Sequence, residues 1–331
     1  MGIDVNGVQF LAFAKSVDVD FTETAMIGRQ NLYISREEMR QVIESFGDAV
    51  SEDEIVQICE GSDGFSEALL KHLGAMQAHS FDYSAYQKAT YVHDMNEPIP
   101  DKFKEQYTTV LDGGSLEHVF NFPVAIKNCM EMVKVGGHYL AITPANNFFG
   151  HGFYQFSPEL YFAVFSEDNG FKIEKMIAFE EKRRPVWYSV KSPREVSGRV
   201  TLCNSFPVYL LVIAKKVSRR SIFANLPQQS DYTALWSANY GASSPDEGDS
   251  RPPIVEKRPL PIRLAKVVIP SLVRRAMRRV LERRRAPKPV GFDPLFFEPI
   301  DPTSVGRRLG TRLIPTAHGH HPKSRPHKDS N

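Results

Sequence analysis

Three aspartates in the middle of the chain, Asp82, Asp94 and Asp112, each end a short run that reads as a β-strand. In open α/β sheets, ligands bind at the carboxyl ends of the strands, so these side chains are candidates for one site. A carboxylate after the second strand could accept both hydroxyls of a ribose, and one after the third could accept an adenine amino group. Gly28 and Gly113 also follow strands and would let a ligand approach the backbone closely. The pattern predicts a nucleoside site.

Four side chains near these positions are candidates for a general base: Asp112, Glu117, His118 and His151. His118 follows Glu117 and comes one turn after the loop at Asp112, so it could face the same cleft. Histidine titrates near neutral pH, which suits removal of a proton from a hydroxyl or an amine. We therefore predict Glu117 and His118 as catalytic, with a structural pair at a helix start as the alternative. No carboxylate–histidine spacing resembles a metal motif, and no metal site is predicted.

Strand and helix patterns alternate over the first 217 residues, and these elements must position the candidate residues. The predicted strands cover 22–28, 78–82, 89–94, 108–112, 139–143, 171–179 and 209–214, and the predicted helices 35–46, 65–73, 122–133 and 158–165. Gly136 and Gly137 are expected to end the third of these helices. The last two strands have no helix between them, which favours antiparallel pairing. The pattern predicts an α/β fold, a doubly wound Rossmann-like sheet of about seven strands.

The two parts of the chain differ in charge. Residues 218–331 hold 21 Lys/Arg against 10 Asp/Glu, whereas residues 1–217 hold 20 against 29. We predict a linker over 218–262, a basic amphipathic helix over 263–285 and a disordered tail over 286–331. The basic helix could contact an anionic membrane surface or nucleic acid. The oligomeric state cannot be read from the sequence.

The protein is expected to act in a reducing compartment. Its three cysteines, Cys59, Cys129 and Cys203, match no disulfide framework or metal motif. No signal peptide and no run of about 18 apolar residues is apparent. The cytoplasm is the expected location, and the basic helix could attach the protein peripherally to a membrane there.

Four segments resemble class I S-adenosylmethionine-dependent methyltransferases: FDYS (81–84), VHDMNEPIP (92–100), TTVLDGGSLEHVFN (108–121) and MVKVGGHYLAITP (132–144). The resemblance covers about residues 20–217. It implies that S-adenosylmethionine is the cofactor, with Asp82 as the ribose-binding acid, Asp94 as the adenine-binding acid and Asp112 beside the methionine part. The segment 150–162 is similar to a bacterial subset of these proteins.

The glycine-rich loop that marks this family after its first strand is degenerate here. If 22–28 is the first strand, only Gly28 remains of the loop, because Arg29 and Gln30 replace small residues. In a rival alignment the first strand is 55–59 and the loop contains Gly61 and Gly64, although that segment also suits a capped helix. We favour the first alignment.

Two functions follow from the sequence. The first is methyl transfer to a small-molecule or glycan-type acceptor by a domain over 1–217. The second is a binding protein that keeps the methyltransferase fold without its activity. Large Arg29 and Gln30 side chains in the cofactor crevice would favour the second function. Asp82 and Asp94 could also simply cap loops, and the aromatic segment 148–156 could be core or loop packing.

Overall fold

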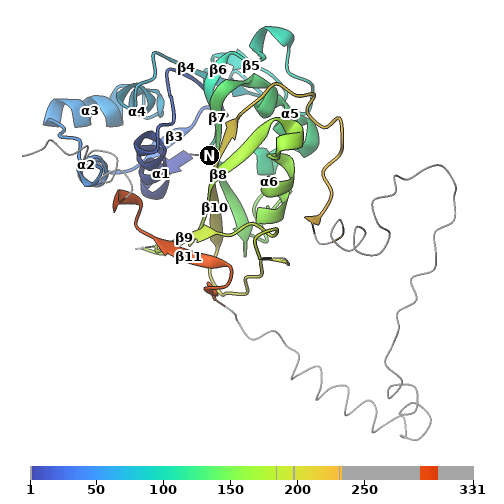
Figure 1. Ribbon diagram of the computed structural model, residues 1–331. Coiled ribbons are helices and arrows are strands. Elements are labelled where there is room, and N and C mark those ends of the chain that lie inside the picture. The colour runs from blue at the N-terminus through green and yellow to red at the C-terminus, as the bar shows by residue number, and fades with distance from the viewer. Residues whose placement is uncertain (1, 184, 197, 231, 233–290, 305–331) are drawn as a thin grey trace, which may run out of the picture.

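The computed structural model describes residues 2–183, 185–196, 198–230, 232 and 291–304. A twisted sheet lies between two layers of helices, with α1 to α4 over one face and α5 and α6 over the other (Figure 1). This is the doubly wound α/β arrangement that the alternating pattern predicts. Each helix buries one apolar stripe against the sheet, and the sheet is buried on both faces.

The described sheet contains nine strands in the order β11-β9-β8-β10-β7-β6-β2-β4-β5. Its strands are β2 (Glu23–Ile27), β4 (Gln77–Asp82), β5 (Tyr91–Val92), β6 (Tyr107–Asp112), β7 (Val133–Asn146), β8 (Phe171–Glu180), β9 (Trp187–Val190), β10 (Val208–Lys216) and β11 (Phe297–Ile300). The strands from β5 to β7 are parallel, and β10 runs antiparallel to both β7 and β8. The predicted antiparallel pairing of the last two strands is therefore confirmed.

Helices α2, α4, α5 and α6 lie within the four predicted helical ranges, and α1 and α3 are additional. They are α1 (Val5–Ser16), α2 (Arg36–Ser45), α3 (Glu52–Glu60), α4 (Glu67–His72), α5 (Phe122–Met132) and α6 (Pro158–Val164), with short 3-10 helices η1 (Asp101–Phe103), η2 (Leu116–His118) and η3 (Glu167–Asn169). Outside the main sheet, β1 (Gly2–Asp4) and β3 (Asn31–Tyr33) pair in parallel. No sequence pattern predicted α1, and α3 confirms the capped helix that was the alternative to a strand over 55–59.

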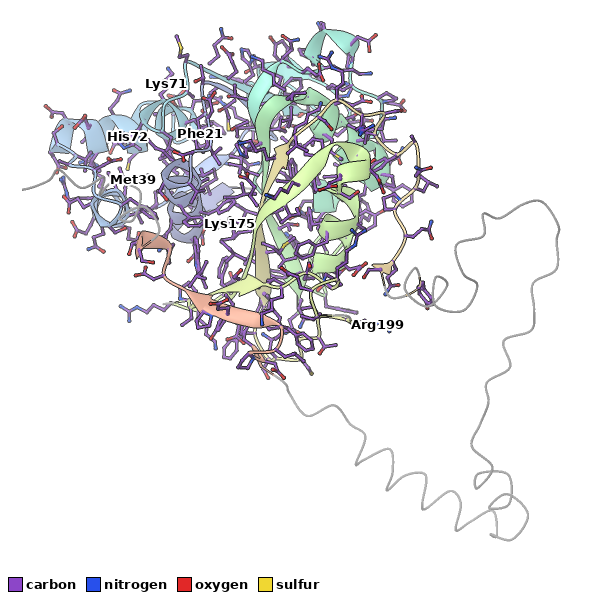
Figure 2. The ribbon with its side chains drawn as sticks, viewed as in Figure 1. Phe21, Met39, Lys71, His72, Lys175 and Arg199 are labelled. Atoms are coloured by element: carbon purple, nitrogen blue, oxygen red, sulfur yellow. The ribbon has the colours of Figure 1, made fainter. Side chains whose placement is uncertain are left out.

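Alternate residues of each central strand enter two separate hydrophobic cores, as the two-residue period of a strand requires. In β6, Val110 packs with α5 and α6, whereas Leu111 packs with α1 to α4. Phe21 and Met39, both labelled in Figure 2, belong to the second core. This two-sided burial fixes the strand register and therefore the positions of the residues at the strand ends.

Two capping boxes decide between the alternative alignments of the first strand. Ser35 and Glu38 form the predicted box at the start of α2, and Ser51 and Glu54 form an equivalent box at the start of α3. Because α3 covers residues 55–59, the alignment that makes this segment the first strand is wrong, and β2 is the first parallel strand of the main sheet.

Two further predictions need correction. Helix α5 ends at Met132, and the glycines expected to end it lie inside β7, where Gly136 takes a positive φ of 91°. The strand predicted over 89–94 is only two residues long in the structure.

A C-terminal strand completes the edge of the sheet. β11 pairs with β9, and Phe297 is buried at the pairing position of Val190. The segment 291–304 is thus ordered, although the sequence predicts it as part of a disordered tail; its short run of aromatic residues carries too little periodicity to be recognised as a strand. The predicted basic helix over 263–285 and most of the predicted linker lie outside the described residues.

Within the described part of the chain, none of the helices combines the length and apolar composition that crossing a bilayer requires. Cys59, Cys129 and Cys203 are all free thiols.

Candidate functional site

The candidate residues meet at the carboxyl edge of the parallel strands. In the register of the sheet, Ile27 at the end of β2 pairs with Phe81 on one side and with Asp112 on the other. Asp82 in turn pairs with Val92 at the end of β5. Since β2 is the strand at which the direction of winding reverses, this edge is where an open α/β sheet binds its ligand.

Arg29 and Gln30 take the place of a glycine-rich loop after β2. Gly28 adopts a positive φ of 72°, and its N–H donates to the Phe81 carbonyl at 2.7 Å. The Gln30 side chain then turns inward, where its Nε2 donates to the Ile27 carbonyl at 2.7 Å and to Ser115 Oγ at 3.1 Å. Gln30 is fully buried, so its side chain fills the space between the ends of β2 and β6.

The Arg29 guanidinium is held on three sides. Its Nε donates to Glu67 Oε1 at 2.6 Å, and Nη1 donates to the Gln87 carbonyl at 2.9 Å. The guanidinium also stacks over the Phe65 ring at 3.9 Å from its centroid. Arg29 therefore links the loop after β2 to the loop after β4, and its charge is paired with the carboxylate of Glu67.

Asp82 and Asp94 differ in how much of their carboxylate the protein already uses. Asp82 is half-buried, and its Oδ1 accepts only a long bond of 3.3 Å from the Ser84 N–H. Asp94 Oδ1 accepts bonds from the Asn96 N–H at 2.9 Å and from Asn96 Nδ2 at 2.7 Å, which lower the pKa of Asp94. Asp82 thus keeps most of its acceptor capacity for a ligand, whereas Asp94 holds a turn.

Asp112 is completely buried and bonded to its own surroundings. Its Oδ1 accepts from the Ser115 and Leu116 N–H groups at 2.8 and 3.3 Å, and Oδ2 accepts from the Tyr139 hydroxyl at 3.3 Å. Burial raises the pKa of Asp112 above its ordinary value in spite of these bonds. In this structure its carboxylate shapes the loop after β6 and is not exposed to a ligand.

Glu117, His118 and His151 form a cluster at the mouth of this edge. Glu117 lies in η2 and is 1% exposed, whereas both histidines are exposed. His151 Nε2 is 3.5 Å from Glu117 Oε1, and the two imidazole rings are 5.0 Å apart between centroids. Burial and the charge of Asp112 raise the pKa of Glu117, and burial lowers the pKa of His118. A buried acid beneath two imidazoles can exchange protons with a molecule at the surface.

The loop after β7 brings His151 to Glu117. The Phe153 N–H donates to the Glu117 carbonyl at 2.8 Å. The preceding residue, Gly152, has a positive φ of 68°. A β-carbon at position 152 would lie only 2.8 Å from the Glu117 carbonyl oxygen. Glycine is therefore required at this approach. The sequence analysis named His151 as a base candidate without a partner; the flanking glycines were a signal that its loop approaches another backbone.

Buried polar atoms without a partner gather at the same edge. Among the described residues, seven buried side-chain atoms have no hydrogen-bond partner, and three of these belong to Gln30, Glu67 and Glu117. Gln30 follows β2, Glu117 follows β6, and Glu67 forms the ion pair with Arg29. Such atoms are costly unless a ligand or water satisfies them, so the edge has unused capacity for polar ligand groups.

Exposed aromatic side chains border the cluster. Phe120, Phe149 and Phe153 are 73%, 100% and 66% exposed, and the Phe120 and Phe153 rings meet edge to face at 5.7 Å. Within the segment 148–156, Phe156 is instead buried in the core. The packing interpretation of this segment thus holds only for part of it, and the remaining rings offer flat apolar surfaces to solvent.

No family model and no curated protein matches the sequence. Solved structures that are similar include a candidate methyltransferase from Bacillus halodurans, with 13% identity over 62% of this chain and 99% of that one, at a TM-score of 0.32. A candidate S-adenosylmethionine-dependent methyltransferase from Listeria monocytogenes has 14% identity over 64% and 99% of the two chains, at a TM-score of 0.34. A branched-chain polyamine synthase from Thermus thermophilus, in complex with 5′-methylthioadenosine, has 11% identity over 65% and 57%, at 0.33.

With identities below 15% and TM-scores below 0.5, these similarities assign neither an activity nor a ligand to the chain. The sheet itself is doubly wound, as the alternating pattern predicts, with parallel strands in both directions from β2. Its β10 strand is reversed and lies between β7 and β8. The chain has a doubly wound α/β fold.

Proposed function

We propose that this chain is an S-adenosylmethionine-dependent methyltransferase that acts on a small-molecule or glycan-type acceptor. The observation that carries the proposal is that two carboxylates with unused hydrogen-bonding capacity lie at the same edge of the sheet. Asp82 keeps free acceptor capacity at the end of β4, and Glu117 keeps a buried, unpartnered oxygen after β6. The first suits the cofactor and the second suits the acceptor.

The residues on this edge fit the nucleoside half of the cofactor. Asp82 would accept the ribose hydroxyls, Asp94 Oδ2 is left for the adenine amino group, and the backbone at Gly28 and Gly113 would border the ligand. When bound, the cofactor supplies a methyl group on a sulfonium sulfur.

The acceptor would lie over Glu117 and His118. The exposed rings of Phe120, Phe149 and Phe153 can stack on an apolar ring or on the flat face of a sugar, which favours a cyclic acceptor. Glu117 and His118 promote loss of the acceptor's proton, and holding the nucleophile in line with the methyl group contributes most of the rate.

A second candidate function is favoured by Gln30. Its buried side chain lies against Gly113, in the space that a glycine-rich loop would leave open. A large side chain in this crevice favours a binding protein without activity. In that case the edge binds no cofactor, and the fold serves as a scaffold for a partner.

Calorimetric titration of the full chain with S-adenosylhomocysteine tests the first function against the second. The full chain is needed because β11, which a 1–217 fragment lacks, completes the sheet. We expect saturable binding by the wild type. Absence of heat at millimolar ligand, in the wild type and in Gln30→Gly alike, would reject the methyltransferase and leave the scaffold. Binding by Gln30→Gly alone would show that Gln30 closes an ancestral cofactor site, and would also reject activity of the natural chain.

A further inference from the structure

Glu117, His118 and His151 have the composition of a metal-binding site, although the sequence spacing predicts none. Each residue offers one ligand atom, and these three atoms lie within 4.8 Å of one another. In tetrahedral Zn²⁺ sites, bonds of about 2.0–2.2 Å place neighbouring ligand atoms roughly 3.4 Å apart. The distance of 3.5 Å between His151 Nε2 and Glu117 Oε1 already matches this edge. A small rotation of the exposed His118 side chain would complete three ligands.

The burial of Glu117 is a second, independent observation that points to a cation. Its Oε2 has no hydrogen-bond partner and the side chain is 1% exposed. Asp112 is also buried nearby, and among the described residues no Lys or Arg forms an ion pair with either acid. Keeping two neighbouring buried acids ionised without a cation is costly, and a divalent ion bound to Glu117 would favour the ionised form of this carboxyl group.

A simple His151–Glu117 ion pair explains less of the geometry. It uses one Glu117 oxygen and leaves the other buried without a partner. It also gives no role to His118, whose ring nitrogens have no hydrogen bond within the part of the chain that the structure describes, although the ring packs against the His151 ring. A metal ion between the three side chains would engage all of them.

The geometry points to a binding site for a divalent transition-metal ion, Zn²⁺ being the best match, with Glu117, His118 and His151 as ligands. Two imidazole nitrogens and one carboxylate oxygen are the ligand set of open zinc sites, in which the fourth position is taken by water or substrate. Because both histidines are exposed, that position faces solvent. If the proposed function holds, the acceptor hydroxyl would occupy this position, and the cation would lower its pKa.

Zn²⁺ competition with a chromogenic chelator tests the site in the full-length, metal-stripped protein. The background variant is His318→Ala/His320→Ala/His321→Ala/His327→Ala, which removes other histidines capable of binding zinc. We expect one Zn²⁺ equivalent per chain in this background. His118→Ala/His151→Ala and Glu117→Gln should each weaken binding at least tenfold. His72→Ala/His93→Ala, which removes two histidines outside the cluster, should leave the affinity unchanged.

A Co²⁺ titration of the unsubstituted cluster gives a readout that does not depend on how the variants fold. Co²⁺ bound in a tetrahedral site with nitrogen ligands should absorb intensely in the visible range. Added Zn²⁺ should displace the Co²⁺ and abolish this absorption. Affinity unchanged by the His118/His151 substitutions, or failure of the background protein to retain Zn²⁺ or Co²⁺, would overturn the metal site. Titration of the same samples with S-adenosylhomocysteine separates this result from the proposed function, because each ligand can bind when the other does not.

Discussion

The Gln30 side chain lies so close to Gly113 that a β-carbon at position 113 would be 2.8 Å from the Gln30 Cδ atom. Gln30 cannot move away without losing its bonds to the Ile27 carbonyl and to Ser115 Oγ. We therefore expect Gly113→Ala to lower the free energy of unfolding by about 1–3 kcal/mol, the usual cost of adding a carbon to a packed interior. Denaturant unfolding measures this loss.

A double-mutant cycle identifies Gln30 as the obstacle. In Gln30→Ala/Gly113→Ala, the added β-carbon would have room, so the loss should be smaller than the sum of the single losses by about 0.5–3 kcal/mol. Strict additivity would mean that the strain at position 113 has another source.

Asp82→Ala is expected to weaken binding of S-adenosylhomocysteine by about 1–3 kcal/mol, since a charged acceptor for the ribose hydroxyls is lost. Its stability should change by less than about 0.5 kcal/mol, because the side chain makes only one long bond to the protein. Isothermal titration gives the affinity. Asp94→Ala serves as the comparison, and we expect a smaller loss of affinity because Asn96 already uses one Asp94 oxygen. Equal losses in the two variants would contradict the assignment of the ribose to Asp82.

The sequence located the ends of β4 and β6 correctly, because apolar runs with a terminal aspartate are local signals, but it placed the end of β5 at Asp94, two residues too late. It could not show which carboxylates stay available. Asp112 points inward because the Ser115 and Leu116 N–H groups and the Tyr139 hydroxyl, from a strand far along the chain, bond to it. The meeting of His151 with Glu117 likewise depends on a backbone bond between two distant loops. Such contacts follow from the packing of the whole sheet and not from local residue patterns.

The burial of Asp112 predicts a specific dependence of stability on pH. Its pKa is raised in the folded state, so above the ordinary carboxyl pKa of about 4 the folded protein binds more protons than the unfolded chain. The contribution of Asp112 to stability is therefore fully present below about pH 4 and is lost as the pH rises through the raised value. Asp112→Asn cannot ionise and lacks this loss. We expect the stability of the wild type relative to Asp112→Asn to fall by roughly 1–3 kcal/mol between pH 4 and pH 7.

Unfolding experiments on both proteins, with a chelator present throughout, measure this difference at each pH. The charge of Asp112 also raises the pKa of Glu117, so the comparison reports the titration of these two carboxyl groups together. A relative stability that stays constant or rises between pH 4 and pH 7 would contradict a raised pKa for Asp112.

Because Phe297 is buried, we expect the C-terminal strand β11 to stabilise the whole domain. The side chain is 3% exposed, lies opposite Val190 in the β11–β9 pair and meets the Phe292 ring edge to face at 5.0 Å. Its removal would leave a cavity at the edge of the first core, and large-to-small changes of a buried phenylalanine cost about 3–5 kcal/mol. We expect Phe297→Ala to lose an amount near the lower end of this range, because an edge strand can adjust to the cavity. Leu295→Ala, at a position that is 59% exposed, is the matched control and should lose less than about 0.5 kcal/mol. Equal stability of the two variants in denaturant unfolding would show that β11 does not fold with the rest of the sheet.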